Sequence, residues 1–155
     1  PHHEMSAAQS AVMTGKPFAH HYVHTGMIGL DGEKMSKSLG NLVFVSQLIS
    51  QGVNPMAIRW ALLNRSYRKD AMWSDSILAQ SIVSIDRLQL NLAKMEVAPT
   101  DGVITEVIKA LSEDLDTERA LRVVENWMGD TESGQSGGSA GELSRALDTL
   151  LGIAL

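Results

Sequence analysis

The sequence contains no cysteine, which excludes disulfide bonds and thiolate zinc clusters made by its 155 residues alone. Only 5% of the residues are aromatic, yet 44% are hydrophobic, which is enough for a packed core. No apolar run approaches the roughly 20 residues that span a bilayer, so we expect no membrane partner. With 13 basic and 18 acidic side chains the formal net charge is −5, which argues against a general nucleic-acid-coating protein.

The chain starts with Pro1-His2-His3-Glu4 and lacks an initiator methionine. A tag remnant and a truncated or cleaved protein both explain this start, and the motifs described below favour the second. The first residues are polar and rich in histidine, so no signal peptide is recognisable. We therefore expect a cytoplasmic protein of which this chain is one part.

The first third of the sequence predicts short helices and strands. Residues 4–14 are good helix formers that end at Gly15, and residues 22–30 favour one or two short strands. Asp31-Gly32 is a strong turn signal, and residues 42–45 suggest another brief strand.

From residue 46 onward the pattern is helical. Asn54-Pro55 predicts a helix start with an N-cap followed by proline, and Ser74 is expected to cap a long helix over 75–96. Asp116 or Thr117 is expected to cap a later helix. The apolar stripe of the long helix has helical spacing and comprises Leu78, Ile82, Ile85, Leu88, Leu92 and Met95.

These patterns predict a mainly α fold in two parts. We expect residues 1–45 to form a mixed segment and residues 46–155 a helical bundle. The glycine- and serine-rich residues 129–141 are expected to be a flexible loop within the bundle. The three tryptophans lie at or near helical apolar faces. We assign Trp60, Trp73 and Trp127 to core or interdomain packing.

Lys34-Met35-Ser36-Lys37-Ser38 is the segment that indicates chemistry. In a loop, Lys34 and Lys37 can converge on one polyphosphate, while Ser36 and Ser38 add hydroxyl donors. Such cations stabilise the charge that develops on the α-phosphate and on pyrophosphate during nucleotidyl transfer. A solvated basic loop is the alternative for an arbitrary pair of lysines, but the complete five-residue string favours nucleotide binding.

This string, placed after an Asp-Gly turn and before a helical region, resembles the signature loop of class I aminoacyl-tRNA synthetases. The order of Pro1-His2-His3-Glu4, His24-x-Gly26 and residues 32–41 is similar to that in cysteinyl-tRNA synthetases. Residues 20–32 and 41–46 more closely resemble the cysteine ligases of mycothiol biosynthesis. The resemblance covers nearly all of this chain but only the C-terminal part of the family's length, so it implies a remnant of a Rossmann-type catalytic domain followed by the helical bundle.

The resemblance to the ligases implies an ATP-dependent reaction that joins L-cysteine to an amino-sugar inositol through a cysteinyl-adenylate. Lys34 and Lys37 are then the expected catalytic residues, and Met35, Ser36 and Ser38 complete the expected nucleotide-binding loop. The backbone at residue 28, which is Ile28, is expected to contact adenine, and Mg²⁺ is expected to accompany ATP.

The resemblance also implies one Zn²⁺ ion in the complete protein. His2 matches a zinc ligand of the family, whereas Ser6 stands where cysteinyl-tRNA synthetases carry a glutamate ligand. Two cysteines and one histidine are the ligands that the ligases use, and the cysteines would lie before Pro1. Three protein ligands leave a position on zinc that can take the thiolate of substrate cysteine.

Two other functions stay open at this point. A cysteinyl-tRNA synthetase would use tRNA as the acceptor, and a non-catalytic helical interaction module would make the lysine loop incidental. The basic cluster of Arg59, Arg65, Arg68 and Lys69 around Tyr67 could touch tRNA in the first case, but we favour a solvated face or an interdomain contact. We expect the 155 residues alone to be inactive, because the other nucleotide-binding signature of the family is not among them.

Overall fold

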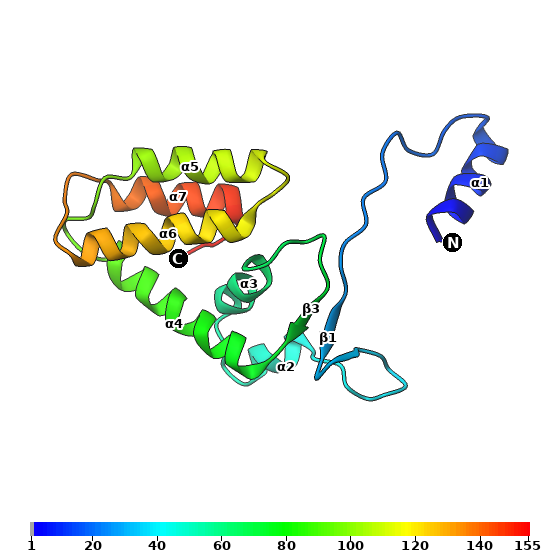
Figure 1. The fold of residues 1–155 in the computed structure, drawn as a ribbon, viewed down its shortest axis with the longest axis horizontal. Helices are drawn as coiled ribbons and strands as arrows, with labels where there is room; N and C mark the ends of the chain where they lie inside the picture. The colour runs from blue at the N-terminus through cyan, green and yellow to red at the C-terminus, as the bar shows by residue number, and fades with distance from the viewer. Residues whose placement is uncertain (1) are drawn as a thin grey trace.

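The computed structural model describes residues 2–155 and has the expected mainly α fold (Figure 1). The helices are α1 His2–Thr14, α2 Val45–Ser50, α3 Pro55–Leu63, α4 Asp75–Leu92, α5 Asp101–Ser112, α6 Thr117–Glu132 and α7 Ala140–Leu151. The strands are β1 Ile28–Leu30, β2 Glu33–Lys34 and β3 Ala71–Trp73. Within residues 2–155, none of the helices combines the length and the apolar character needed to cross a bilayer.

Three of the expected helix starts are confirmed by side-chain caps. The Asn54 side chain accepts a hydrogen bond from the Met56 amide at 2.9 Å, with Pro55 at the first helical position. Ser74 caps α4, and the Asp116 carboxylate caps α6. Each cap satisfies an amide that the first turn of a helix leaves without a partner.

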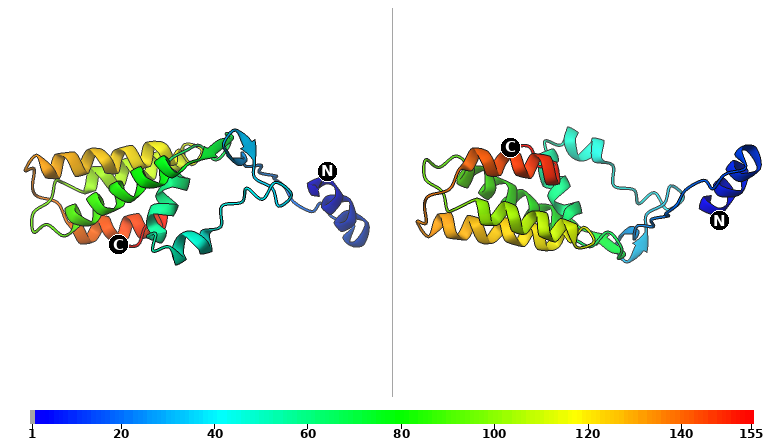
Figure 2. Two further views of the ribbon diagram at one scale, coloured as in Figure 1. Left: turned by 90° about the horizontal axis from the view of Figure 1, so that it is seen from below. Right: turned by 90° about the horizontal axis from the view of Figure 1, so that it is seen from above.

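Helices α3 to α7 share one hydrophobic core. Figure 2 shows α4 to α7 lying side by side, and α5 packs against both α6 and α7. Trp60 and Trp127 are each 1% exposed, so their predicted place in the core is confirmed. The Trp127 indole also donates a hydrogen bond to the carbonyl of Ala98 at 3.0 Å, which satisfies its only polar atom.

The predicted end of the long helix is wrong. Helix α4 ends at Leu92, and Met95 is fully exposed although it continues the apolar spacing. The chain turns at residues 93–96 so that Val97 and Ala98 enter the core instead.

The predicted strand at 42–45 is also wrong. Among the described residues the sheet contains only β2, β1 and β3, and residues 41–44 lead directly into α2. Val43 packs against a second, smaller hydrophobic cluster, so its apolar character reflects packing and not strand pairing.

The predicted loop at 129–141 is shorter than expected, because α6 continues to Glu132 and α7 begins at Ala140. Thr131 is buried, and its hydroxyl accepts a hydrogen bond from the Ala98 amide at 3.1 Å. The Gly138 amide donates to the Val97 carbonyl at 3.0 Å, which ties the end of the loop to the α4–α5 connection.

The small sheet has the order β2-β1-β3. Strands β1 and β2 form an antiparallel hairpin, whereas β3 pairs with β1 in parallel. Strand β3 is not predicted from the sequence. It brings Trp73, 8% exposed, into the second cluster, which also contains Ile58, Ala61 and Leu78.

Helix α1 lies away from the bundle, at the far end of an extended segment that leads into β1 (Figures 1 and 2). None of its described residues is buried. We call residues 2–27 the N-terminal arm. The β1–β2 hairpin follows the arm and leads into the lysine loop, residues 34–41, and no residue of either belongs to the main core.

Candidate functional site

The β1–β2 hairpin places Lys34 at the start of the lysine loop, residues 34–41. Asp31 and Gly32 have φ angles of 53° and 83°, which is the pattern of a two-residue turn with a left-handed backbone at both positions. This turn fits the twist of the flanking strands, and it pairs Leu30 with Glu33. Lys34 therefore leaves the sheet in a fixed direction.

The lysine loop is closed by the side chain of Asn41. Its Oδ1 accepts a hydrogen bond from the Ser36 amide at 2.8 Å, and its Nδ2 donates to the Lys34 carbonyl at 3.3 Å. The Ser36 hydroxyl accepts from the Leu39 amide at 3.3 Å and lies 3.1 Å from the Ser38 hydroxyl. These hydrogen bonds of Asn41, which join the two ends of the loop, are not evident from the sequence.

The five residues of the lysine motif face different surroundings. Met35 is partly buried and packs against the second hydrophobic cluster, so it anchors the loop. Lys34, Lys37 and Ser38 are exposed, and Ser36 is half-buried. The structure therefore brings both ammonium groups to the surface of one short, internally bonded loop, where an anion can reach them.

The backbone polar groups of Ile28 point toward the β2 side of β1. The Ala71 amide of β3 donates to the Met27 carbonyl at 2.9 Å, so Met27 and Gly29 face β3 and Ile28 faces the other way. The β1–β2 register includes only Gly29 and Leu30, and it stops one residue short of Ile28. Ile28 therefore lies at the end of the β1–β2 register, on the side of β1 away from β3.

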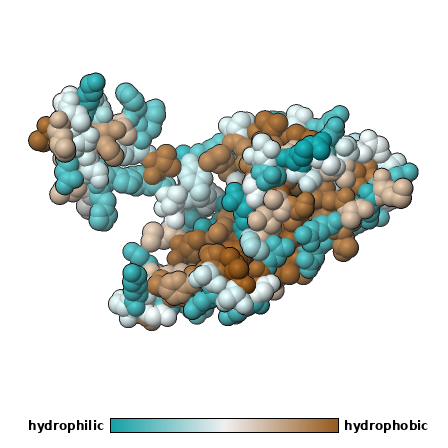
Figure 3. Space-filling model, turned by 180° about the vertical axis from the view of Figure 1, so that it is seen from behind, coloured by the Kyte–Doolittle hydropathy of each residue, from teal (hydrophilic) through white to brown (hydrophobic). Residues whose placement is uncertain are grey.

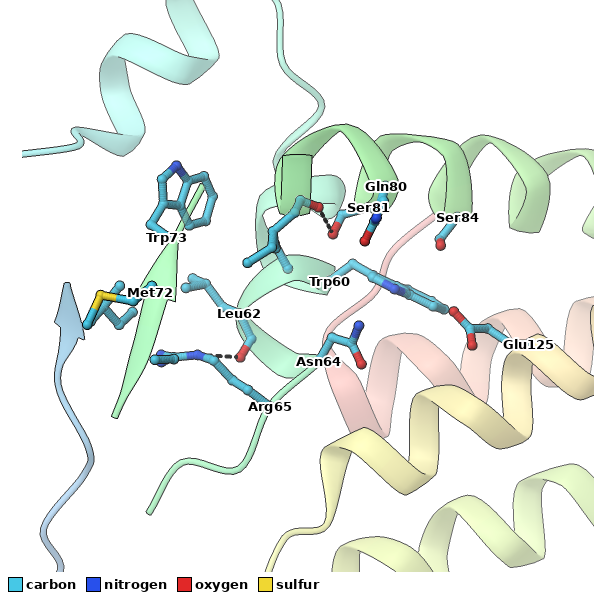
Figure 4. A pocket seen from close by; sticks show the side chains of 14 residues that line it. Trp60, Leu62, Asn64, Arg65, Met72, Trp73, Gln80, Ser81, Ser84 and Glu125 are labelled. Carbon is cyan, nitrogen blue, oxygen red and sulfur yellow. Dashed lines mark hydrogen bonds between the residues drawn. The ribbon is translucent and has the colours of Figure 1, made fainter. Parts of the chain in front are cut away.

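A pocket of about 460 Å³ lies beside β1 and β3, between α3, α4 and α6 (Figure 4). Met72 and Arg65 lie at one end in Figure 4, and Trp60 and Glu125 lie at the other. Within residues 2–155, no fully buried side-chain nitrogen or oxygen lacks a hydrogen-bond partner. The pocket therefore offers space next to β1, but no unsatisfied buried polar group that demands a ligand.

The arm is joined to the bundle side of the molecule by a few backbone contacts just before β1. The Gly26 amide donates to the Tyr67 carbonyl at 2.7 Å, and the Met27 amide donates to Asp70 Oδ1, also at 2.7 Å. A Cβ atom at Gly26 would lie 2.1 Å from the Lys69 carbonyl oxygen, so only glycine permits this approach. We call residues 64–70 the anchor loop. The contacts of the anchor loop, like the hydrogen bonds of Asn41, are not evident from the sequence.

The basic cluster expected from the sequence divides into separate contacts. Arg68 pairs with Asp114 at the start of the bundle's α5–α6 turn, and its guanidinium lies 5.1 Å from the Tyr67 ring centroid. Arg59 instead donates to the Leu151 carbonyl at the end of α7. Both contacts join parts of residues 46–155, so they lie within the predicted bundle and not between the two predicted domains.

The histidines of the arm do not assemble a metal centre. The ring centroids of His3 and His24 are 4.5 Å apart, and His3 stacks on Tyr22 at 5.8 Å. His2 is exposed on α1. Within residues 2–155, no group of three His, Cys, Asp or Glu side chains could hold a metal ion, so these residues do not by themselves fit the expected zinc site.

Residues 1–83 match the family model described as the tRNA synthetases class I (C) catalytic domain. The chain belongs to this synthetase family. The matched residues include the arm, the sheet, the lysine loop and the start of α4, so the synthetase-family region contains every candidate residue named above.

The curated relatives of this synthetase-family chain are named L-cysteine:1D-myo-inositol 2-amino-2-deoxy-alpha-D-glucopyranoside ligase. Those of Streptomyces griseus subsp. griseus and Streptomyces coelicolor are 47% and 48% identical over 158 residues. The relative of Gordonia bronchialis is 47% identical. All of this chain is covered in each comparison, but the chain spans only 38–39% of the length of these relatives.

A similar solved structure is the LeuRS of Agrobacterium radiobacter K84, determined in a ternary complex with tRNA and LeuAMS. It superposes with a TM-score of 0.65 and 22% identity, covering 96% of this chain and 23% of that one. This likeness supports the fold assignment, a class I synthetase remnant with its helical bundle.

Proposed function

We propose that the complete protein containing this chain is an ATP-dependent ligase that joins L-cysteine to glucosaminyl-inositol. The observation that carries the proposal is the identity of 47% to a curated ligase of that name across the whole chain. The lysine loop of this synthetase family is present in full, closed by Asn41 and exposed to solvent.

The first step of the proposed reaction activates cysteine. The cysteine carboxylate attacks the α-phosphorus of ATP, the bond from that phosphorus to the bridging oxygen breaks, and pyrophosphate leaves with the electron pair. Lys34 and Lys37 bind the phosphates and stabilise the charge that grows on the leaving group. Lys37 is the stronger candidate for the transition state, and Mg²⁺ would accompany ATP.

The second step transfers the cysteinyl group. The sugar amine attacks the acyl carbon of cysteinyl-adenylate, AMP leaves, and the amine loses a proton, so an amide is formed. The exposed hydroxyl of Ser38 and the amides of the loop can follow the phosphates through the reaction. The position of Ile28 at the end of the β1–β2 register, beside the lysine loop, supports its predicted contact with adenine.

The proposed zinc site depends on residues outside this chain. His2 would be one ligand, and two cysteines from the preceding part of the protein would supply the others. Because the described residues do not make this site, no step of the reaction above is routed through the metal.

A cysteinyl-tRNA synthetase is the second candidate, and the family description of residues 1–83 as a tRNA synthetase domain is what favours it. The two candidates share the first step and differ in the acceptor, a sugar amine or a tRNA hydroxyl. The helical interaction module is a third candidate, and it predicts that ATP gives residues 34–38 of the complete protein no protection from proteolysis.

The deciding experiment uses the complete protein. We expect ATP–pyrophosphate exchange that depends on cysteine, and AMP release that increases when glucosaminyl-inositol is added but not when tRNA is added. Stimulation by tRNA alone would assign the synthetase activity instead. Absence of cysteine-dependent exchange would refute both enzymatic candidates.

Three narrower predictions accompany the proposal. We expect the 155 residues alone to show no exchange, because the chain spans only 39% of the length of a curated ligase. The division between a nucleotide-binding part, residues 1–45, and a bundle, residues 46–155, stays a prediction, as does a cytoplasmic location.

A further inference from the structure

The turn between α5 and α6 has an unusual backbone. Asp114 and Leu115 have φ angles of 59° and 55°, so two successive residues that are not glycine adopt the left-handed conformation. This conformation is unfavourable for residues with a Cβ atom, and it persists only where other contacts fix it. Asp114 makes such contacts through its side chain.

The Asp114 carboxylate holds the anchor loop. It accepts hydrogen bonds from Arg68 Nε at 2.6 Å and Arg68 Nη2 at 2.9 Å, and from the Tyr67 hydroxyl at 2.8 Å. At the start of α6, Glu118 accepts from the Ser66 amide at 3.1 Å. The Arg68 hydrogen bonds hold the pKa of Asp114 below its ordinary value, so the carboxylate is charged at neutral pH.

The opposite side of the same loop holds the strand that leads to Ile28. The Tyr67 carbonyl accepts from the Gly26 amide, and the Asp70 carboxylate accepts from the Met27 amide, each at 2.7 Å. Tyr67 thus contacts the bundle through its hydroxyl group and the segment before β1 through its backbone carbonyl. A continuous set of contacts runs from the α5–α6 turn to the residue before Ile28.

We propose that Asp114 is a positioning residue for the nucleotide. By fixing the anchor loop, it holds the backbone of Gly26 and Met27, and so it orients the Ile28 edge that would receive the base. This inference rests on the proposed function only in assuming that the complete protein binds ATP at β1. Asp114 itself contacts no nucleotide, so its removal should weaken nucleotide binding without removing a reacting group.

The test is the affinity of the complete protein for α,β-methylene-ATP, an analogue that binds without being cleaved at the α-phosphate. Asp114→Asn removes the charge but keeps a residue type that adopts the left-handed backbone readily. We expect the Kd to rise roughly threefold to tenfold, the range typical of residues that act on a site through others. Arg68→Gln should have the same effect, and the double variant should add little to either change.

Glu113→Gln is the matched control. Glu113 is adjacent, carries the same charge and has a similar side-chain exposure of 54% against 57%, but it pairs with Arg119 and not with the anchor loop. We expect its Kd to equal that of the unmodified protein. An equal rise of the Kd in both variants would overturn the positioning role of Asp114. The rise would then result from the lost negative charge and not from the lost contact with the anchor loop.

Amide hydrogen exchange gives a readout independent of binding. In Asp114→Asn the amides of Gly26 and Met27 should exchange faster, since their acceptors lie in the loop that Asp114 fixes. Faster exchange with unchanged Kd would overturn the proposal, as would unchanged exchange. If the unmodified complete protein binds no analogue, the proposed function fails instead, which is a separate result.

Discussion

The helical bundle and the N-terminal arm differ in how their residues are held. In the bundle, Trp127 and Leu147 are each 1% exposed within one continuous core. In the arm, Val12 is 88% exposed, and α1 has no buried residue among those described. Since burial of apolar surface is the main stabilising contribution to folding, the bundle contributes most of the stability of this chain.

The lysine loop and Ile28 lie between these two regions. They are held by a hairpin, by Asn41 and by the anchor loop, and not by the main core. Figure 3 shows apolar surface also outside the bundle, and exposed apolar residues of this part include Phe44, Val45, Ile49 and Met72. The main core and the candidate chemistry thus occupy different parts of the chain, so stability and activity can be changed separately.

The largest change in stability should come from Trp127→Ala in the bundle. Loss of a buried aromatic side chain from a packed core costs about 3–5 kcal/mol of unfolding free energy. The variant also leaves the Ala98 carbonyl without its indole donor. Urea denaturation of the 155-residue chain, followed by circular dichroism, measures this loss.

Two controls sharpen the contrast between bundle and arm. Leu90→Ala on the exposed side of α4, 70% exposed, and Val12→Ala in the arm should each change the unfolding free energy by at most about 0.5 kcal/mol. A loss in Val12→Ala as large as that in Trp127→Ala would contradict the division of roles.

Lys37→Ala should separate activity from stability. Removing one cation that stabilises transition-state charge typically lowers kcat by roughly 10²- to 10³-fold. Lys37 is exposed, so the melting temperature should not change. The measurement is cysteine-dependent ATP–pyrophosphate exchange by the complete protein, with Lys16→Ala in the arm as the control that keeps full activity.

Gly26→Ala tests the junction of the two regions. The added Cβ would lie 2.1 Å from the Lys69 carbonyl, and such overpacking costs about 1–3 kcal/mol. Gly102→Ala in α5 is the matched control, because nothing lies within 4 Å of its Cβ position. That control should not destabilise the chain, because alanine fits a helical position at least as well as glycine. Equal effects of the same sign in thermal denaturation would disprove the close approach.

The smallest effect concerns the pH dependence of the bundle. Hydrogen bonds from Arg87, and then from Asn91, lower the pKa of Glu132 from 4.5 to about 2. A carboxylate with a depressed pKa stabilises the fold above pH 4.5, and this contribution disappears as the pH falls toward 2. Screening by solvent makes this contribution to stability small, because the Glu132 side chain is 40% exposed.

We therefore expect the melting temperature of Glu132→Gln to lie below that of the unmodified chain above pH 4.5, with the difference vanishing near pH 2. Glu96→Gln, an exposed residue with no ion pair found among the described residues, is the control. A difference in melting temperature that stays constant with pH would show that Glu132 acts through packing and not through its charge.

The bundle is the part of the fold that the sequence predicts well. Asn54-Pro55, Ser74 and Asp116 are local signals, since each cap contacts amides two or three residues away. The lysine motif is likewise contiguous in the sequence. Local signals of this kind need no knowledge of distant contacts.

The errors and omissions concern contacts that are distant in sequence. Strand β3 has three residues, and its partner β1 lies far earlier in the chain, so no local pattern identifies it. Asp70 and Asp114 have acceptor roles that appear only when the anchor loop meets the arm and the bundle. Met95 continues a helical spacing that the chain abandons in order to bury Val97.

The parallel pairing of β1 with β3 has a consequence for synthesis on the ribosome. Met27 and the Asp70 carboxylate that binds it are separated by 43 residues, so β1 emerges together with β2 but before β3. A newly made chain can form the β1–β2 hairpin at once, but it must leave the other edge of β1 unpaired until residues up to Trp73 have been translated. The period for which this edge of β1 stays exposed would depend on the speed of elongation.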